Sequence, residues 1–438
     1  MGALMTTVPV VTTNPELLDR VRALVQSCAG GNLEIAPVGN APDVVDFLSL
    51  EMPDLAFIDF SDPAIDSFAL LDTIQKDSWL LYSTLIAICG DDGSSERLEE
   101  IRSANIAICL AADDLERRLP KVLDIISQNK RILFQRAIGA ELASTIAGSY
   151  KLQNDTVEVN CYVNLVCNYL FNANKIDEQG KMFVHVALTE MLLNGIEHGN
   201  CGIGYDEKGA WLEEGNSMSA LIEQKCQDPA IRARRVTFEY TITPVKSVFF
   251  IADEGPGFDW RKQQDAISGG NLQELHGRGI RMTRKYTKNF RYNERGNEVH
   301  FEIDHADDFA NTMPGLFENI EPVNVADGTI VFREGEPGDF LYYIVKGRYD
   351  VLVGGTRVST LTPDDVFMGE MSFLLNNRRS ATVRAVGDGT LIRISKRDFV
   401  GAIKQKPHYA LFLSRLLAQR VQRRNMACEE AWAQQPPK

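Results

Sequence analysis

Several patterns that mark large classes of protein are missing from this sequence or rare in it. The eight cysteines are scattered and none forms a C-x-x-C pair, which disfavours a zinc site or a disulfide framework and favours reduced thiols. No apolar run reaches the length of a membrane span and no signal-peptide pattern follows Met1, so we expect a cytoplasmic protein with no membrane partner. Lys and Arg number 46 against 60 Asp and Glu, a net charge of −14. This balance argues against a nucleic-acid partner, because such a partner requires a basic face.

The composition is otherwise that of a globular protein, and 438 residues are enough for about two to four domains. The first part of the chain alternates short apolar runs with helical stretches. The apolar runs are 8–11, 55–58, 85–88 and 106–110, and the helical stretches are 15–26, 41–49, 65–75 and 95–103. This alternation predicts a parallel sheet with helices on both faces.

The segment 53–63, which places Asp59 at the end of an apolar run, resembles the phosphoacceptor strand of response-regulator receiver domains. The resemblance implies a flavodoxin-like fold with Asp59 at the acceptor position. Where that family has two acidic Mg²⁺ ligands this chain has Thr12 and Thr13, and Ala111 stands near the position of the family's lysine. A Mg²⁺ ion would lose two of its carboxylate ligands, and an acyl phosphate its cation. We therefore interpret this part as a pseudo-receiver, a docking or dimerisation module in which Asp59 is a satisfied strand-end carboxylate.

The middle of the chain contains three segments rich in glycine and acidic residues, in the order 190–199, 253–257 and 277–279. Glu190, Asn194 and His198 recur every fourth residue within an apolar helical pattern, so they share one face of a helix. An asparagine on such a face suits a Mg²⁺ ion that keeps several waters and touches phosphate oxygens. The first segment therefore predicts one wall of a nucleotide pocket.

The second and third segments supply the features that such a pocket needs for the base and the phosphates. Asp253 follows the strand-like run 248–252, and a strand-end carboxylate can accept a hydrogen bond from an exocyclic amine such as that of adenine. Glycines after it allow the backbone to approach a ligand, and Gly277 and Gly279 precede a possible helix whose N–H groups face phosphate.

In this order and spacing the three segments resemble the GHKL ATPase fold, and most of all the serine kinases that act as anti-sigma factors, over roughly residues 140–305. The resemblance implies an α/β sandwich, with Glu190 as the general base and Asn194 as the Mg²⁺ ligand. The other ATP-binding residues that it implies are His198, Asp253, Gly255, Gly257, Gly277 and Gly279. We expect no histidine kinase, because the acceptor histidine of that class lies upstream of the ATPase domain and the first histidine in this sequence is His185.

The last part of the chain changes to short β-type runs with glycine turns, from about Val325 onward, which predicts a small barrel or jelly roll. Within it, segment 367–383 resembles the phosphate-binding cassette of cyclic-nucleotide-binding domains, and the resemblance extends over roughly residues 312–425. Fewer than forty residues follow Phe399, so we expect no helix-turn-helix of the kind found in catabolite activators.

The side chains of the cassette can bind a ribose and a phosphate on chemical grounds alone. Gly369 precedes a short helix, Glu370 can accept a hydrogen bond from a ribose 2′-hydroxyl, and Arg379 can form a charge-assisted pair with a cyclic phosphate. The resemblance adds further binding residues, namely Met371, Ser372, Ser380 and Ala381. Ser380 after the arginine resembles the cyclic-AMP type, which favours cAMP over cGMP.

These readings predict a multidomain protein of α/β and α+β parts. The expected domains are a pseudo-receiver (1–128), a helical linker (129–145), a GHKL kinase domain (146–305) and a cyclic-nucleotide-binding domain with C-terminal helices (306–438). We expect a homodimeric regulator in which a cyclic nucleotide controls an ATP- and Mg²⁺-dependent serine kinase. Its expected partner is a STAS-type anti-sigma-factor antagonist or a sigma factor. The alternative is a scaffold that binds both nucleotides and acts by protein docking without phosphoryl transfer.

Residues 201–235 separate the first two ATP-type segments and have mixed charge with glycine. This pattern fits either a lid over ATP or a pair of partner-binding helices. The arginines at 232, 234 and 235 fit phosphate contacts or a solvated basic face.

Overall fold

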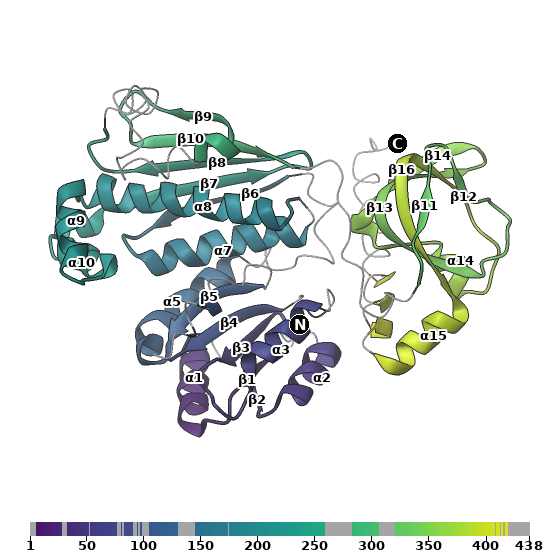
Figure 1. The fold of residues 1–438 in the computed structure, drawn as a ribbon, viewed down its shortest axis with the longest axis horizontal. Coiled ribbons are helices and arrows are strands. Elements are labelled where there is room, and N and C mark those ends of the chain that lie inside the picture. The colour runs from purple at the N-terminus through teal and green to yellow at the C-terminus, as the bar shows by residue number, and fades with distance from the viewer. Residues whose placement is uncertain are drawn as a thin grey trace, which may run out of the picture.

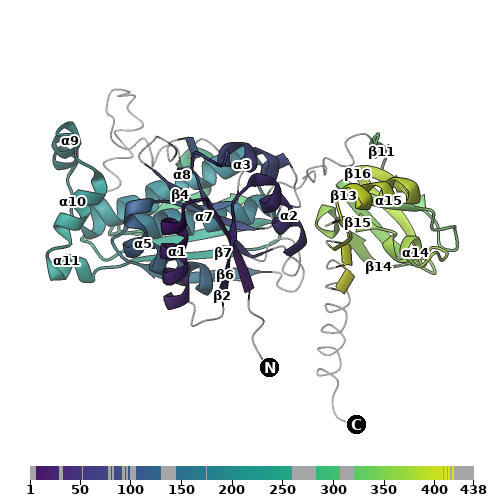
Figure 2. The same ribbon diagram turned by 90° about the horizontal axis from the view of Figure 1, so that it is seen from below.

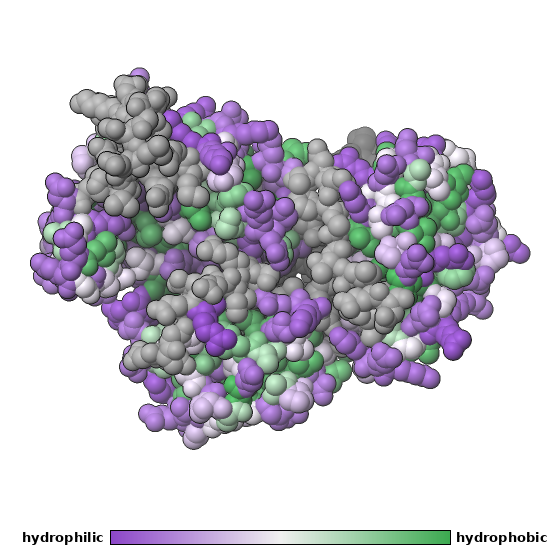
Figure 3. Space-filling view, in the orientation of Figure 1, coloured by the Kyte–Doolittle hydropathy of each residue, from purple (hydrophilic) through white to green (hydrophobic). Residues whose placement is uncertain are grey.

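A computed structural model of the chain describes residues 6–28, 33–51, 53–76, 80, 83–90, 94, 97–98, 105–129, 145–173, 175–258, 283–305, 320–407, 409–411, 413–414 and 417–418. These residues form three β-sheets, each with its own helices (Figure 1). None of the helices in the described ranges is long and apolar enough to cross a membrane. On the face drawn in Figure 3 hydrophilic residues predominate, and hydrophobic residues gather mainly over the strands of the third sheet.

The first sheet is parallel, as the βα alternation predicted, and its strand order is β2-β1-β3-β4-β5. This is the order of flavodoxin-like doubly wound sheets. The strands are β1 (Thr6–Val11), β2 (Leu33–Val38), β3 (Leu55–Asp59), β4 (Thr84–Cys89) and β5 (Ile106–Ala111). Every residue of β3 and β4 is buried, because helices cover both faces of the sheet.

Two pairs of helices cover the first sheet. Apolar residues of α1 (Pro15–Cys28) and α5 (Leu115–Gln128) pack on one face, and those of α2 (Ala41–Glu51) and α3 (Ser67–Lys76) pack on the other. The helical stretches at 15–26, 41–49 and 65–75 were thus predicted to within a few residues. The linker predicted at 129–145 lies almost entirely outside the described residues.

One sequence expectation fails in this sheet. The structure joins Cys89 and Cys109 in a disulfide, with their Cα atoms 6.5 Å apart, whereas the spacing of the cysteines favoured reduced thiols throughout. β4 and β5 are neighbouring strands, and their register sets Cys89 opposite Ala111, two residues along β5 from Cys109. A sequence separation of 20 residues between the two cysteines gives no sign of this neighbourhood.

The second sheet is antiparallel, in the order β6-β7-β8-β10-β9. Its strands are β6 (Ile146–Leu152), β7 (Val236–Ile242), β8 (Lys246–Asp253), β9 (Lys288–Tyr292) and β10 (Glu298–Asp304). Alternate residues such as Phe238, Phe249 and Phe301 are buried, since one face of the sheet packs against helices α7 (Thr156–Asn172) and α8 (Glu178–Asn194).

Three short helices fill the segment between the first two ATP-type motifs. They are α9 (Tyr205–Glu213), α10 (Met218–Lys225) and α11 (Pro229–Ala233). Figure 2 shows them together at the end of the molecule farthest from the third sheet.

The third sheet is antiparallel and jelly-roll-like, as predicted. Its main path is β11-β16-β13-β14, with β12 paired to β16 and β15 paired to β13. The strands are β11 (Val323–Val325), β12 (Ile330–Phe332), β13 (Phe340–Val353), β14 (Thr356–Leu361), β15 (Phe367–Met368) and β16 (Thr382–Ser395). Helices α14 (Glu370–Leu374) and α15 (Lys396–Gln405) complete it. This part has hydrophobic clusters of its own, separate from those of the other two sheets.

Candidate functional sites

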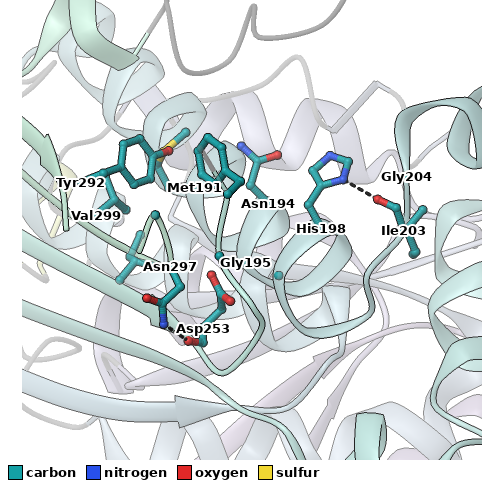
Figure 4. A pocket seen from close by; sticks show the side chains of 15 residues that line it. Met191, Asn194, Gly195, His198, Ile203, Gly204, Asp253, Tyr292, Asn297 and Val299 are labelled. Carbon is teal, nitrogen blue, oxygen red and sulfur yellow. Dashed lines mark hydrogen bonds between the residues drawn. The ribbon is translucent and has the colours of Figure 1, made fainter. Parts of the chain in front are cut away.

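A cavity of about 170 Å³ opens where α8 ends and β8 and β10 meet (Figure 4). It brings together four of the residues predicted for the ATP site, Asn194, His198, Asp253 and Gly257. The remaining lining residues are Met191, Gly195, Gly199, Ile203, Gly204, Ile251, Phe258, Tyr292, Gly296, Asn297 and Val299. Figure 4 shows Tyr292, Val299 and Asn297 on one side and His198 with Ile203 on the other.

The polar wall of the cavity is built by a change of helix type. Asp177 caps the start of α8 by accepting a hydrogen bond from the Gly180 N–H, and α8 runs to Asn194. The chain then continues as a π-helical turn, Gly195–Asn200, which contains His198. Such turns are rare and occur often at functional sites. His198 Nδ1 lies 2.6 Å from the Ile203 carbonyl oxygen, which accepts the bond, so Nδ1 carries the proton.

Asp253 ends β8 at the floor of the cavity. Burial raises the pKa of its carboxyl group to about 6, although the Gly255 N–H, Arg295 and Arg234 act in the opposite direction. The Gly255 N–H donates to Asp253 Oδ1 at 2.8 Å, and Asn297 Nδ2 donates to the Asp253 carbonyl oxygen at 2.8 Å. The carboxylate is therefore held in one orientation in a poorly hydrated place.

The glycines around Asp253 are required by close approaches of the backbone. A Cβ atom on Gly199 would lie 2.3–2.7 Å from the Asp253 carboxyl atoms, and one on Gly255 would lie 2.0 Å from the Gly199 carbonyl oxygen. Gly257 has φ of +79°, a conformation that favours glycine. These positions set the turn that brings the second motif onto the first. Gly277 and Gly279 lie outside the described residues.

Glu190, the predicted general base, lies one helical turn before Asn194. It is half-buried and is not part of the cavity lining. Burial raises the pKa of Glu190, Lys208 opposes that rise, and Glu197 adds to it. Lys208 itself forms an ion pair of 2.5 Å with the buried Glu197.

Phe258, Tyr292 and Asn297 are among the lining residues that the sequence did not identify as site residues. Phe258 and Tyr292 meet edge to face with ring centroids 5.2 Å apart, and they close the apolar end of the cavity. Asn297 follows Gly296 in the turn between β9 and β10. This glycine was only a weak indication that the next residue lines the pocket.

The cassette of the third sheet is organised around Arg379. Its side chain is 4% exposed and donates to the Gly369 carbonyl at 2.8 Å, to Ser372 Oγ at 2.8 Å and to the Phe340 carbonyl at 2.6 Å. The guanidinium carbon lies 4.2 Å from the centre of the Phe332 ring. Gly369 has φ of +79°, and a Cβ there would meet Arg379 Nη1 at 2.2 Å.

Arg379 is a buried cation whose hydrogen bonds go to neutral groups, while the carboxylates of Glu336, Asp339 and Glu370 act on it from a greater distance. None of the ion pairs found among the described residues includes it, and its Nε atom is buried without a hydrogen-bond partner. Burial lowers the pKa of Arg379. The other predicted cassette residues surround it: Glu370, Ser372 and Ala381 are buried, whereas Met371 and Ser380 are exposed. This arrangement presents a desolvated positive charge with fixed orientation.

Asp59 is enclosed by hydrogen bonds at the end of β3. It is 2% exposed, and its carboxylate accepts from Thr12 Oγ1 at 2.9 Å and from the Ser61 N–H and Oγ at 2.9 and 2.6 Å. Next to it, burial disfavours ionisation of Asp62, but hydrogen bonds from Thr13 and others outweigh this and lower the pKa of Asp62. Thr12 and Thr13 are thus hydrogen-bond donors to the carboxylates of Asp59 and Asp62.

The part of the chain that is similar to known proteins contains the third sheet. The chain matches the family described as "Cyclic nucleotide-binding domain" over residues 322–406. It is 37% identical over 78 residues to a cGMP-dependent protein kinase of Plasmodium berghei, which is 18% of this chain and 9% of that protein. It is 37% identical over 92 residues to a cAMP-dependent protein kinase regulatory subunit of Dictyostelium discoideum, which is 19% of this chain and 28% of that protein. The chain therefore spans less than a third of either relative.

Among solved structures, the catabolite activator protein of Thermus thermophilus is 26% identical with a TM-score of 0.24, over 26% of this chain and 62% of that one. The family match, the antiparallel sheet and the position of Arg379 agree with one another. Residues 322–406 are a cyclic nucleotide-binding domain, similar to the regulatory parts of cyclic-nucleotide-dependent kinases.

Proposed function

We propose that this chain is a cytoplasmic signalling regulator in which cyclic nucleotide binding to the C-terminal domain controls an ATP-dependent serine kinase in the middle domain. The observation that carries the kinase part is the convergence of Asn194, His198, Asp253 and Gly257, from two separate motifs, on a single cavity. In this proposal the domains keep the predicted boundaries, a pseudo-receiver to 128, a linker to 145 and a GHKL domain to 305.

The chemistry of the cavity suits a purine nucleotide. Asp253 Oδ2 would accept a hydrogen bond from the exocyclic amine of adenine, with Phe258, Tyr292 and Val299 against the ring. Asn194 would contribute one oxygen to a Mg²⁺ ion that otherwise rests on phosphate oxygens and water, the coordination that Mg²⁺ prefers. Among the described residues no group of three or more His, Cys, Asp or Glu side chains could hold a metal. A one-asparagine site is consistent with that, because the nucleotide supplies the charged ligands.

Glu190 would take the proton of the substrate serine. The rise in its pKa brings it nearer the working pH, which makes a carboxylate a better general base. Phosphoryl transfer otherwise needs positioning and charge neutralisation, which Asn194, the Mg²⁺ ion and the glycines of the third motif would provide.

In the C-terminal domain Arg379 would pair with the cyclic phosphate, and Glu370 with the ribose hydroxyl. Ser380 is exposed and follows the arginine as in the cyclic-AMP type that the segment resembles, and we propose cAMP rather than cGMP on that resemblance. The partner would be a STAS-type anti-sigma-factor antagonist or a sigma factor, and the regulator would act as a homodimer.

A second candidate is a scaffold that binds ATP and cyclic nucleotide without transferring phosphate. One observation favours it: Glu190 does not line the cavity that holds the other residues. Incubating the purified chain with γ-labelled ATP, Mg²⁺ and a STAS-type protein separates the two. Label on a serine of that protein, lost in Glu190→Gln, supports the kinase; tight ATP binding with no label supports the scaffold.

A further inference from the structure

Asn200, the last residue of the π-helical turn, joins three segments of the chain. It is completely buried. Its Nδ2 donates to Asn154 Oδ1 at 2.8 Å, its Oδ1 accepts from the Glu254 N–H at 2.9 Å, and its carbonyl oxygen accepts from Arg234 Nη1 at 2.5 Å. The Asn200 side chain thus binds two loops at once. It accepts from the Glu254 N–H in the loop after Asp253 and donates to Asn154 in the β6–α7 loop.

The bond to Glu254 fixes the floor of the cavity. Glu254 follows Asp253 directly, so the Asn200 side chain sets the position of the loop relative to the motif that contains Asn194 and His198. The same loop has a second support, because Arg295 Nη2 donates to the Gly255 carbonyl at 2.9 Å. Without Asn200, the partly buried Glu254 N–H would lose its partner, and the loop that contains Asp253 would lose one of its two supports.

The bond to Asn154 leads away from the cavity to the N-terminal domain. Asn154 also donates to the Ile231 carbonyl at 2.9 Å, and its neighbour Asp155 accepts from Lys121 Nζ of α5 at 2.9 Å. The same lysine pairs with Glu158, at the start of α7, at 2.7 Å. The β6–α7 loop is therefore bound on both sides. Asn200 of the pocket binds Asn154, and Lys121 of the N-terminal domain binds Asp155.

Helix α7 makes the contact between the two domains extensive. Asn164 and Asn168 donate to the carbonyl oxygens of Ala107 and Ile106 in β5, at 2.9 and 3.0 Å. One continuous hydrophobic cluster runs from the first sheet through α5 and α7 to the second sheet. Because interiors are close-packed, the N-terminal domain cannot shift without disturbing α7 and the loop before it.

We propose that Asn200 is a positioning residue for the nucleotide pocket, and that the N-terminal domain serves as a fixed brace for this pocket through Lys121 and Asn154. The inference rests on the proposed nucleotide site. The inference assigns a role to the N-terminal domain, in which Asp59 is buried and hydrogen-bonded to Thr12 and Ser61. In this role the domain maintains the shape of the nucleotide pocket, so that removing the domain would disable the pocket.

The test uses the full chain and measures Mg²⁺–ATP affinity by calorimetry in Asn200→Ala, Asn154→Ala and Lys121→Met. We expect Asn200→Ala to weaken affinity by about tenfold, because the Glu254 N–H and Asn154 Oδ1, both partly buried, lose their partner together. Asn154→Ala and Lys121→Met weaken it by about threefold, since each removes one support of the loop. Lys76→Met is the matched control, because Lys76 is exposed and pairs with Asp72 of its own helix, and we expect this variant to leave the affinity unchanged.

Two further readouts separate positioning from general destabilisation. The cAMP affinity of each variant stays at the wild-type value and reports that the C-terminal domain is folded, and an unchanged far-UV circular dichroism spectrum reports that the first two sheets and their helices are folded. Amide hydrogen exchange at Glu254 and Gly255, measured without any nucleotide, becomes faster in Asn200→Ala while exchange in β13 does not change. If Asn200→Ala does not fold, Asn154→Ala and Lys121→Met decide the matter by the same measurements.

The results that overturn the inference differ from those that overturn the proposed function. Wild-type ATP affinity in Asn200→Ala, or equal effects of Lys121→Met and Lys76→Met, contradicts the brace. A wild-type chain that binds no ATP contradicts the proposed function, and the exchange rates at Glu254 and Gly255 then decide the role of Asn200 alone.

Discussion

Replacing Arg379 by alanine removes the one buried cation of the cassette and gives a sharp test of cyclic nucleotide binding. The side chain is 4% exposed, its hydrogen bonds go to two carbonyl oxygens and one hydroxyl, and no carboxylate among the described residues pairs with it. In our proposal this positive charge pairs with the cyclic phosphate, in surroundings where water screens little. Truncating one member of a desolvated charge pair costs about 2–5 kcal/mol.

That loss converts to an affinity, since each 1.4 kcal/mol is about a tenfold change. We expect Arg379→Ala to bind cAMP roughly thirtyfold more weakly or worse. Arg379→Lys should fall between the two, because it keeps the charge but cannot reach Gly369, Ser372 and Phe340 together. Arg378→Ala is the matched control: Arg378 is the exposed neighbour, and its side chain donates to the Gly335 carbonyl at 2.7 Å.

Fluorescence anisotropy of a labelled cAMP, with unlabelled cAMP and cGMP as competitors, measures these affinities. Equal affinity in Arg379→Ala and wild type would refute the assignment of the phosphate site. Equal losses in the Arg379 and Arg378 variants would show that general surface charge is responsible.

Three other predictions concern the remaining sites. Asn194→Ala should abolish Mg²⁺-dependent ATP binding in calorimetry, whereas Glu190→Ala should retain binding and lose transfer; undiminished binding in Asn194→Ala contradicts the metal assignment. Burial raises the pKa of Asp253 to about 6, so the protonated form stabilises the folded chain. This contribution to the free energy of unfolding is fully present below about pH 4 and is lost as the pH rises through 6. The affinity for ATP needs the ionised form and therefore increases over the same pH range. Asp253→Asn should remove both dependences, and an unchanged pH profile in that variant would refute this reading. Incubation with acetyl phosphate and Mg²⁺ should leave the intact mass unchanged, since Asp59 is buried and already hydrogen-bonded; a phosphate adduct that disappears in Asp59→Asn would show the opposite.

The elements that the sequence predicted well are those whose signal is local. Periodic apolar residues marked α1, α2 and α3, and the i, i+4 spacing of Asn194 and His198 placed both on one cavity, even though the helix turns π-helical after Asn194. Glycine spacing in the second motif was equally informative, because it reflects the contact between backbone and the Asp253 carboxylate.

The features that were missed depend on contacts between distant segments. Asn200 and Asn297 are single amides next to turns, and only the folded chain shows which backbone groups they satisfy. The pairing of Cys89 with Cys109 needs two strands to be neighbours. Helix α7 did carry a signal, since it is apolar on nearly all sides, a pattern typical of a helix buried between two layers. That pattern predicts a helix covered on both sides, and its partners, β5 and α8, follow only from the tertiary structure.

The central claim is that a cyclic nucleotide bound near Arg379 controls transfer of phosphate in the middle domain. The most direct measurement is the rate at which γ-phosphate moves from ATP to a serine of a STAS-type partner, with and without saturating cAMP. We predict a rate that depends on Glu190 and that cAMP changes in the wild-type chain, and that the same cAMP concentration leaves unaltered in Arg379→Ala. Absence of transfer, or an identical rate with and without cAMP in the wild-type chain, would contradict it.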